Sequence, residues 1–380
     1  MVIYYAIVSS SKHTKGVINA NQESTYHFLV SIGCLVFGTC GEQNSDESKT
    51  LLSILEVSSS NHPEMMNTRN MSVDPEPEPE PPWDGVGWGI KKDFTGYGRN
   101  GAVTFAINGK GYLAGGVSYY GFQNDLWEYD PTTDSWTQKV SIPVPLGYRH
   151  ASGFALNGKG YYGLGIDNNS TLYKNWREYN PITNQWVSKL NFPGSARFGA
   201  VSFTIGSKGY LGTGATTDYS DGNNIKSDFW EYNPTTDSWR KVAGLPTANR
   251  RTYATSFVIG TTGYVGGGSP DEVKNASLQD FWKYQPVEGK PGTWAQISSL
   301  PAQRTDMLGF SLWGVGIAGG GSEVQLWSYH PRTDSWQREV NLPYFPHDSL
   351  TFRSVFTIGD YAYGIVGQKV YQFYKVPPGQ

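Results

Sequence analysis

One phrase recurs along this chain about every fifty residues, and it constrains the fold more than any other feature. Its two clearest copies are Leu126-Trp-Glu-Tyr-Asp-Pro-Thr-Thr-Asp-Ser-Trp136 and Phe229-Trp-Glu-Tyr-Asn-Pro-Thr-Thr-Asp-Ser-Trp239. A unit of this length cannot bury its own apolar face, so several copies must pack side by side. The sequence therefore predicts an array of similar units rather than one irregular core.

Each unit contains four strand-like stretches. In the first unit, residues 102–107 lead through Asn108-Gly109 into residues 110–116, and Asn-Gly is a strong hairpin signal because both residues tolerate a positive φ. The third and fourth stretches carry the tryptophans and are joined by a Pro-Thr-Thr-Asp turn. The chain's 46 Gly, 25 Tyr and 13 Trp fit β-structure packed by aromatic rings, so the predicted fold class is all-β.

A residue of the second stretch gives the register of the units. It falls at Tyr112, Tyr161, Tyr210, Tyr264, Ile317 and Tyr363. The last unit then lacks a fourth stretch, whereas an unused one lies around Trp88 at the other end of the propeller sequence. We therefore expect six units, with the Trp88 segment pairing beside the Tyr371 segment and closing a ring without exposed edges.

The glycine pair after an aromatic strand, the tyrosine and the later tryptophan resemble the kelch repeat, over residues 83–380. The resemblance implies a six-bladed β-propeller with four antiparallel strands per blade, closed by the N-terminal strand. Galactose oxidase has a similar propeller, but its copper-radical chemistry needs a cysteine joined to a tyrosine. Cys34 and Cys40 are the chain's two cysteines and precede the propeller, so the resemblance covers the fold and not that activity. We expect no cofactor.

Bacterial sialic-acid mutarotases are also similar in fold, with six kelch blades. That resemblance implies that a ring of arginines would hold the substrate carboxylate. The family's large inserted segment and its acid/base carboxylate have no evident counterpart here. Asp306, two residues after Arg304, is the nearest candidate for the carboxylate.

The first 82 residues have a different character. An apolar run ends at Cys40, and residues 1–40 resemble the leader of a bacterial lipoprotein, in which Cys40 would be lipidated. Residues 41–82 are polar and end in alternating Pro and Glu, which is typical of an extended, disordered linker. We therefore expect an exported protein, in the periplasm, at the cell surface or on the outer membrane, with membrane contact only through this lipid. The open alternative is an unprocessed disordered leader.

Charge and composition exclude several functions. The formal net charge is −3, so no basic surface for nucleic acid is expected. The propeller region holds three histidines, widely spaced, and no phosphate-binding loop or nucleophile elbow. The sequence therefore predicts no metal site and no hydrolase motif.

The loops between second and third strands are the longest and most varied, and variable loops on a rigid scaffold usually carry binding. Five arginines enter this face: Arg99, Arg149, Arg197, Arg251 and Arg304. Converging guanidiniums would bind a carboxylate or sulfate in bidentate fashion. The alternative is structural, with each arginine bonded to backbone carbonyls to tie the blades together. Both remain open from the sequence.

Aromatic residues of the long loops are further candidates for ligand contact: Tyr119, Tyr120, Phe122 and Tyr219. Their rings would stack on a sugar or pack against adjacent loops. His150, beside Arg149, is either an acid/base group or a hydrogen-bonded neighbour. The first hypothesis is therefore a non-catalytic, extracytoplasmic binding or scaffold module that recognises a glycan or an acidic protein segment on the long-loop face. The second is a mutarotase or epimerase of an acidic sugar such as sialic acid.

Overall fold

The computed structural model describes residues 86–145, 147–217, 224–271, 276–321, 323–343 and 354–375. The predicted leader (1–40) with Cys40, the predicted linker (41–82) and Tyr219 lie outside these ranges. Within them the chain forms 27 strands and one short 3-10 helix, η1 (Thr247–Asn249), so the predicted all-β class is confirmed. No helix in these ranges has the length and apolar character needed to cross a membrane.

Most strands of the described ranges belong to six antiparallel sheets of four strands. The first three sheets are β3 (Val103–Ile107), β4 (Lys110–Ala114), β7 (Leu126–Asp130) and β8 (Ser135–Lys139); β9 (Ser152–Leu156), β10 (Lys159–Gly163), β11 (Trp176–Asn180) and β12 (Gln185–Lys189); and β13 (Val201–Ile205), β14 (Lys208–Gly212), β15 (Phe229–Asn233) and β16 (Ser238–Val242). The next two are β17 (Thr255–Ile259), β18 (Thr262–Gly266), β19 (Phe281–Val287) and β20 (Lys290–Ile297); and β21 (Leu308–Leu312), β22 (Val315–Gly319), β23 (Leu326–His330) and β24 (Ser335–Arg338).

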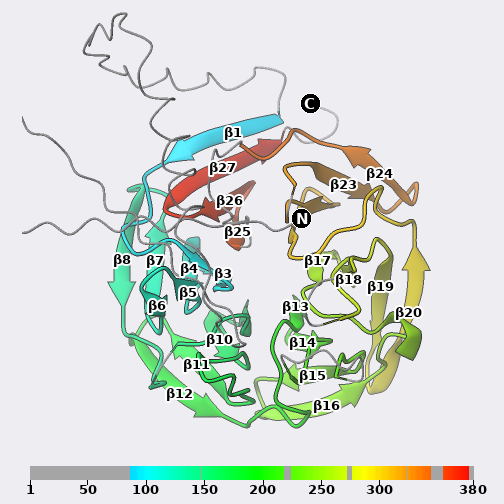
Figure 1. Cartoon of the computed structure of the whole chain (residues 1–380), viewed down its shortest axis with the longest axis horizontal. Helices are drawn as coiled ribbons and strands as arrows, with labels where there is room; N and C mark the ends of the chain where they lie inside the picture. The colour runs from blue at the N-terminus through cyan, green and yellow to red at the C-terminus, as the bar shows by residue number, and fades with distance from the viewer. Residues whose placement is uncertain are drawn as a thin grey trace, which may run out of the picture. The chain divides into compact units, whose positions relative to one another are not determined.

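The last sheet combines strands from both ends of the described chain. It contains β25 (Ser354–Ile358), β26 (Tyr361–Val366), β27 (Lys369–Lys375) and β1 (Val86–Lys91). β1 runs antiparallel to β27 along its whole length, with Trp88 opposite Phe373 and Ile90 opposite Tyr371. In Figure 1, β1 lies directly alongside β27, with β26 and β25 following inward.

A smaller three-stranded sheet shapes one loop of the first four-stranded sheet. It consists of β2 (Arg99–Asn100), β5 (Val117–Ser118) and β6 (Gly121–Phe122). Arg99 pairs with Ser118, and Ser118 pairs with Gly121. The loop after β4 is therefore a β-hairpin fixed to the segment that enters β3.

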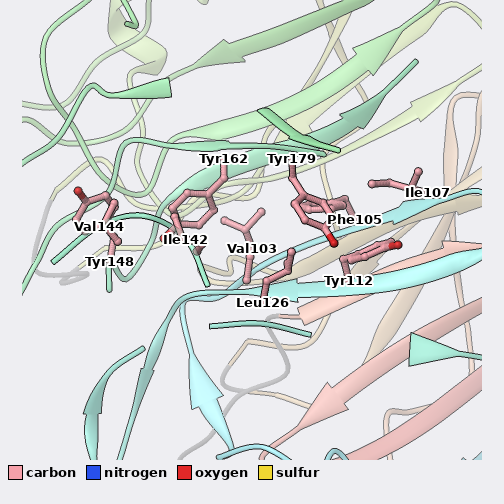
Figure 2. Packing of buried hydrophobic residues seen from close by; sticks show 11 residues of the cluster. Val103, Phe105, Ile107, Tyr112, Leu126, Ile142, Val144, Tyr148, Tyr162 and Tyr179 are labelled. Carbon is pink, nitrogen blue, oxygen red and sulfur yellow. The ribbon is translucent and has the colours of Figure 1, made fainter. Parts of the chain in front are cut away.

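The core lies between neighbouring sheets, and aromatic rings fill most of it. Figure 2 shows Phe105 and Tyr112 of the first sheet beside Tyr179 of the second. The rings of Phe105 and Tyr112 stack with centroids 5.6 Å apart, and Tyr112 meets Tyr179 edge to face at 5.9 Å. Such offset and edge contacts are the favoured geometries for aromatic pairs.

A glycine near the start of the second strand permits this close approach. A Cβ built on Gly209 of β14 would lie 2.1 Å from the ring of Phe154 in the preceding sheet. The same ring-on-glycine contact recurs at Gly111, Gly160, Gly263 and Gly316. The Lys-Gly-Tyr motif of the repeat is thus explained by packing against the neighbouring sheet.

The Asp-Ser-Trp turn also joins neighbouring sheets. The Asp237 carboxylate accepts the backbone N–H of Leu190, which follows the preceding sheet, at 3.1 and 3.2 Å. Trp239 Nε1 donates to the Leu190 carbonyl at 3.0 Å, and the Tyr232 hydroxyl donates to Asp237 at 2.7 Å. Asn184 and Asp334 accept equivalent backbone N–H groups. The most recognisable part of the repeat is therefore an outer clamp between sheets.

The first strands of the six sheets line one central cavity. In Figure 1, the labelled strands β3, β13, β17 and β25 lie toward the middle, whereas β8, β12, β16 and β20 lie outside. Small residues contribute from every first strand: Thr104, Gly153, Ser202, Ser256, Gly309 and Val355. The described residues that line this cavity along the first strands are therefore uncharged.

Candidate functional site

Four of the five predicted arginines are buried against acceptors of the protein itself. Arg197 is 1% exposed, and its Nη1 donates to the Thr213 carbonyl at 2.9 Å. Its two Nη atoms reach the two carboxylate oxygens of Asp228, at 2.6 and 3.1 Å. Its Nε donates to the Ser195 carbonyl at 3.0 Å. This guanidinium therefore fixes the loop after β14.

Three other arginines repeat this arrangement in their own sheets. Arg99 pairs with Asp125, Arg251 with Asp280, and Arg304 donates to the side-chain amide oxygen of Gln325. Each also donates to a carbonyl sixteen residues later, on Gly115, Gly267 and Gly320, at 3.2, 3.1 and 3.4 Å. The bidentate fork of arginine suits such two-sided bonding.

The second sheet replaces the ion pair with a neutral one. Tyr148 stands where the first, third, fourth and fifth sheets have arginine. Asn175 stands where the first, third and fourth sheets have aspartate and the fifth has Gln325. Asn175 Nδ2 donates to the Tyr148 hydroxyl at 3.2 Å, and Tyr148 stacks on Tyr173 with centroids 4.1 Å apart. Arg149 is the next residue, is half-buried and has no acidic partner among the described residues.

Two of the acidic partners, Asp228 and Asp280, have lowered pKa values and stay ionised in the folded protein. Burial is the largest single influence on Asp228 and raises its pKa, but the hydrogen bond and charge of Arg197 and the Trp230 indole together outweigh it, so the pKa is lowered. For Asp280, burial likewise raises the pKa, and Arg251 and Trp282 lower it to below the ordinary value. Arg197 and Arg251 thus each face a charged carboxylate.

These contacts favour the structural alternative for Arg99, Arg197, Arg251 and Arg304. Each guanidinium is already bonded within its own sheet, and a ligand carboxylate would have to displace a protein acceptor. Replacing the protein's own acceptor by a ligand carboxylate would add little binding free energy, because the arginine only changes one buried partner for another. Arg149 differs because the described residues provide it with no acid.

A pocket opens where the chain enters the first strands, next to these arginines. We call it the mouth pocket; its main residues are Gly101, His150, Gly199, Tyr253 and Asp306. They occupy equivalent positions in five successive sheets, and each is followed by a residue that also lines the pocket: Ala102, Ala151, Ala200, Ala254 and Met307.

The five main positions share an unusual backbone conformation. Their φ angles are +63°, +52°, +63°, +53° and +56° in chain order. Backbone N–H groups link them in series: His150 to the Gly101 carbonyl, Gly199 to His150, Tyr253 to Gly199 and Asp306 to Tyr253, at 2.9, 2.9, 3.0 and 3.0 Å. Three of the five carry side chains, although a left-handed residue other than glycine costs on the order of 1–2 kcal/mol.

The side chains that bear this strain are a histidine, a tyrosine and an aspartate. The His150 and Tyr253 rings meet edge to face, with centroids 5.0 Å apart. Asp306 is bonded through its backbone N–H to the Tyr253 carbonyl. The mouth pocket therefore gathers a carboxyl, an imidazole and a phenol, which are the groups used for general acid and base catalysis.

The other predicted aromatic residues form a separate surface on the β5–β6 hairpin. Tyr119 and Tyr120 are 95% and 72% exposed, and the Tyr120 ring lies against Tyr97 at 4.6 Å. Ser118 Oγ accepts the Tyr120 N–H at 3.1 Å, which fixes the hairpin tip. Phe122 is half-buried at the hairpin base. These residues are not among those lining the mouth pocket.

Sequence reasoning identified His150 and Asp306 as candidates but missed Tyr253, Gly101 and Gly199. The register could have found them, because Gly101, Gly199, Tyr253 and Asp306 each stand two residues after an arginine. Their left-handed backbone, however, is invisible in a pattern that mixes glycine with side chains.

No group of three or more histidine, cysteine, aspartate or glutamate residues with metal-binding geometry occurs in the part of the chain that the structure describes. The residues of the mouth pocket offer one carboxylate and one imidazole, fewer than the three or four protein ligands typical of a zinc site.

Comparison with known proteins finds similarity between this chain and kelch repeats. The Kelch motif family model matches residues 98–141, which span β2 to β8. The predicted kelch resemblance is confirmed. The solved structure of YjhT shares the fold with a TM-score of 0.62 and 14% identity, covering 76% of this chain and 98% of that one.

Several relatives show how far the kelch similarity extends. N-acetylneuraminate epimerase of Haemophilus influenzae (strain 86-028NP) is 24% identical over 208 residues, which is 53% of this chain and 49% of that protein. The enzyme of the same name from Yersinia enterocolitica is 35% identical over 79 residues, 19% and 20% of the two chains. Kelch-like protein 25 of Xenopus tropicalis is 24% identical over 253 residues, 63% and 40%. The kelch match therefore spans about half the length of these relatives, or less.

Proposed function

We propose that this chain is a six-bladed, ring-closed kelch propeller whose mouth pocket binds an acidic sugar and interconverts its anomers. Contacts between first strands support the ring: β3, β9, β13, β17, β21 and β25 contact one another in this order, and β25 also contacts β3. The pairing of β1 with β27 would join the two ends of the propeller in one blade.

One observation carries the catalytic proposal: three ionisable side chains stand at strained, equivalent positions around one pocket. Left-handed backbone at non-glycine residues is held in place by the surrounding structure and clusters at functional sites. Asp306, Tyr253 and His150 meet this description. The similarity to N-acetylneuraminate epimerases selects an acidic sugar as the substrate class.

The chemistry requires one base and one acid on a cyclic sugar. The Asp306 carboxylate would take the proton of the anomeric hydroxyl while His150 or Tyr253 donates a proton to the ring oxygen, so the bond between that oxygen and the anomeric carbon breaks. Rotation of the open-chain carbonyl and the reverse transfers then close the other anomer. Proton transfers of this kind contribute about 10²–10⁴-fold each. We assign the sugar carboxylate to Arg149.

Exchange NMR spectroscopy of N-acetylneuraminate tests this proposal. The wild-type protein should accelerate exchange between the two anomers, and Asp306→Asn, which tolerates the left-handed backbone, should lower the rate about 100-fold or more. Asp93→Asn is the matched control, because Asp93 is half exposed and pairs with Lys369 away from the mouth pocket. Exchange at the spontaneous rate with folded wild-type protein would contradict the catalytic proposal.

The tyrosines of the β5–β6 hairpin support a second candidate, a binding module for a glycan. Tyr119 and Tyr120 are held exposed on a rigid tip, where rings contact a partner at little entropic cost. In that case a glycan array would show capture by the wild-type protein and loss with Tyr119→Ala, while anomer exchange stayed spontaneous. If the partner is instead an acidic protein segment, the protein should capture no glycan on the array.

Export and lipidation at Cys40 stay predictions from the leader sequence. Mass spectrometry of the protein purified from cells would test them. A mature N-terminus at a lipid-modified Cys40 is the expected result, and an unprocessed N-terminus in the soluble cytoplasmic fraction would contradict it.

A further inference from the structure

A second pocket lies at the other end of β21 from Asp306. It is lined by the turn after β21 and the turn after β23: Trp313, Val315, His330, Pro331, Arg332 and Thr333. We call it the turn pocket. Its volume of about 630 Å³ lies within the range of roughly 300–1,000 Å³ typical of small-molecule sites.

The repeat supplies an internal reference for the first of these turns. The position of Trp313 is occupied in the other sheets by Asn108, Asn157, Gly206, Gly260 and Gly359, all with positive φ. Trp313 adopts the same conformation, with φ +46°. Asparagine and glycine tolerate this region, whereas a bulky residue there is a strained outlier. The fifth sheet therefore keeps an indole at a local energetic cost.

The second turn departs from the repeat in the same sheet. Where other sheets have Asp130, Asn180 and Asn233, the side-chain oxygen accepts the backbone N–H two residues later, at 2.9, 3.0 and 3.1 Å. His330 replaces this residue and lies instead 3.2 Å from Ser328 Oγ through its Nε2. The turn thus gives up a hydrogen bond that stabilises its counterparts.

A third departure adds a positive charge. Arg332 stands where the other turns have Thr132, Ile182 and Thr235. It is exposed, and it makes no ion pair with the described residues. Three positions that leave the repeat pattern therefore converge on one cavity, and two of them do so at a cost to the turn.

We propose that the turn pocket is a binding site for a small ring-bearing anion, such as a sugar or aromatic carboxylate. The indole of Trp313 is half-buried and oriented by its Nε1, which donates to Asp360 Oδ1 at 2.8 Å. Trp313 also packs against the core of the last two sheets, and it lines the pocket, where its indole would contact a ligand ring. Arg332 supplies a planar fork of donors for a carboxylate. His330 adds a further polar group on the pocket wall.

The test uses substitutions taken from the other sheets. Trp313→Asn reproduces the Asn-Gly turn, His330→Asn reproduces Asn180 and Asn233, and Arg332→Thr reproduces Thr132 and Thr235. These variants should fold, since the same residues already serve the same turns. His330→Asn should raise the melting temperature slightly, because it restores the lost turn hydrogen bond.

Two-dimensional ¹H–¹⁵N NMR then follows the indole N–H signal of Trp313, identified by its absence in Trp313→Asn. Glucuronate or benzoate should shift this signal in a saturable way, and Arg332→Thr should weaken that binding at least tenfold, or about 1.4 kcal/mol. Glucose, which has the ring without the charge, should bind at least tenfold more weakly than glucuronate. Response to glucuronate alone identifies a sugar acid, and response to benzoate alone an aromatic acid.

The proposal is overturned if neither anion moves the Trp313 signal, or if Arg332→Thr binds as tightly as the wild type. It is independent of the mouth pocket, because Asp306→Asn should leave the Trp313 titration unchanged. Failure of anomer exchange together with an intact titration would overturn the catalytic function and retain this site.

Discussion

At the residue scale, the sheets are spaced by glycines whose missing side chains let a neighbouring ring approach. At Gly209 the expected Cβ position lies 2.1 Å from the buried Phe154 ring, so an added methyl group must displace that ring or move one sheet against the next. The spacing therefore depends on single atoms, as expected for interiors packed to crystal density.

Gly209→Ala should lower the free energy of unfolding by about 1–3 kcal/mol, the usual cost of overpacking. Gly89→Ala is the control, because the nearest atom to its Cβ position is the Gln372 carbonyl oxygen at 4.0 Å and its φ is not positive. Denaturant titration of both variants measures the difference. Equal stabilities for the two would show that Phe154 adjusts without cost.

The ion pair of Arg197 and Asp228 makes part of the stability depend on pH. Because the folded state lowers the pKa of Asp228 below that of the unfolded chain, about 3.9, its contribution is present above about pH 4 and is lost as the pH falls through the folded value. Asp228→Asn should therefore cost about 1.5–3 kcal/mol at pH 7. The difference in the free energy of unfolding between wild type and variant should be smaller at pH 3 than at pH 7. An equal difference at the two pH values would contradict this dependence on pH.

At the element scale, four fourth-strand tryptophans donate hydrogen bonds across to the neighbouring sheet: Trp186, Trp239, Trp294 and Trp336. Trp294 Nε1 donates to the Ala243 carbonyl at 2.7 Å. Trp294→Phe should therefore cost about 0.5–1.5 kcal/mol more than Trp136→Phe, because Trp136 Nε1 has no hydrogen-bond partner among the described residues. Thermal unfolding of the two variants measures this, and an equal loss would assign the tryptophans to packing alone.

The strands were predictable from the sequence, whereas the loops were not. Asn108-Gly109 and the Pro-Thr-Thr-Asp turn specify hairpins locally, and the structure forms the two predicted hairpins of the first sheet there. Asp228 follows Arg197 by 31 residues across a loop of variable length, so spacing carried no sign of their pairing. The mouth pocket was also hard to predict. Its five main residues share a positive φ, but their residue types differ, so that Gly101 of one sheet corresponds to Tyr253 of another.

At the scale of the whole molecule, the pairing of β1 with β27 joins distant parts of the sequence. Trp88 packs on Phe373, with ring centroids 4.9 Å apart, and contacts the core shared by the last two sheets. A chain that starts after Lys91 would leave β27 as an open edge, which invites association.

A protein beginning at residue 92 should therefore melt well below one beginning at residue 86, and it should associate in size-exclusion chromatography. The longer chain is the control, because it also lacks residues 1–85 but keeps β1. Equal melting temperatures and a monomeric shorter chain would contradict the proposed closure.

The proposed function depends on one place, the mouth pocket of Gly101, His150, Gly199, Tyr253 and Asp306. A crystal structure of the protein soaked with N-acetylneuraminate tests it most directly. The account predicts the sugar ring in this pocket, with Asp306 within hydrogen-bond distance of the anomeric hydroxyl. A sugar bound only at the Tyr119 hairpin or in the turn pocket, with the mouth pocket empty, would contradict it.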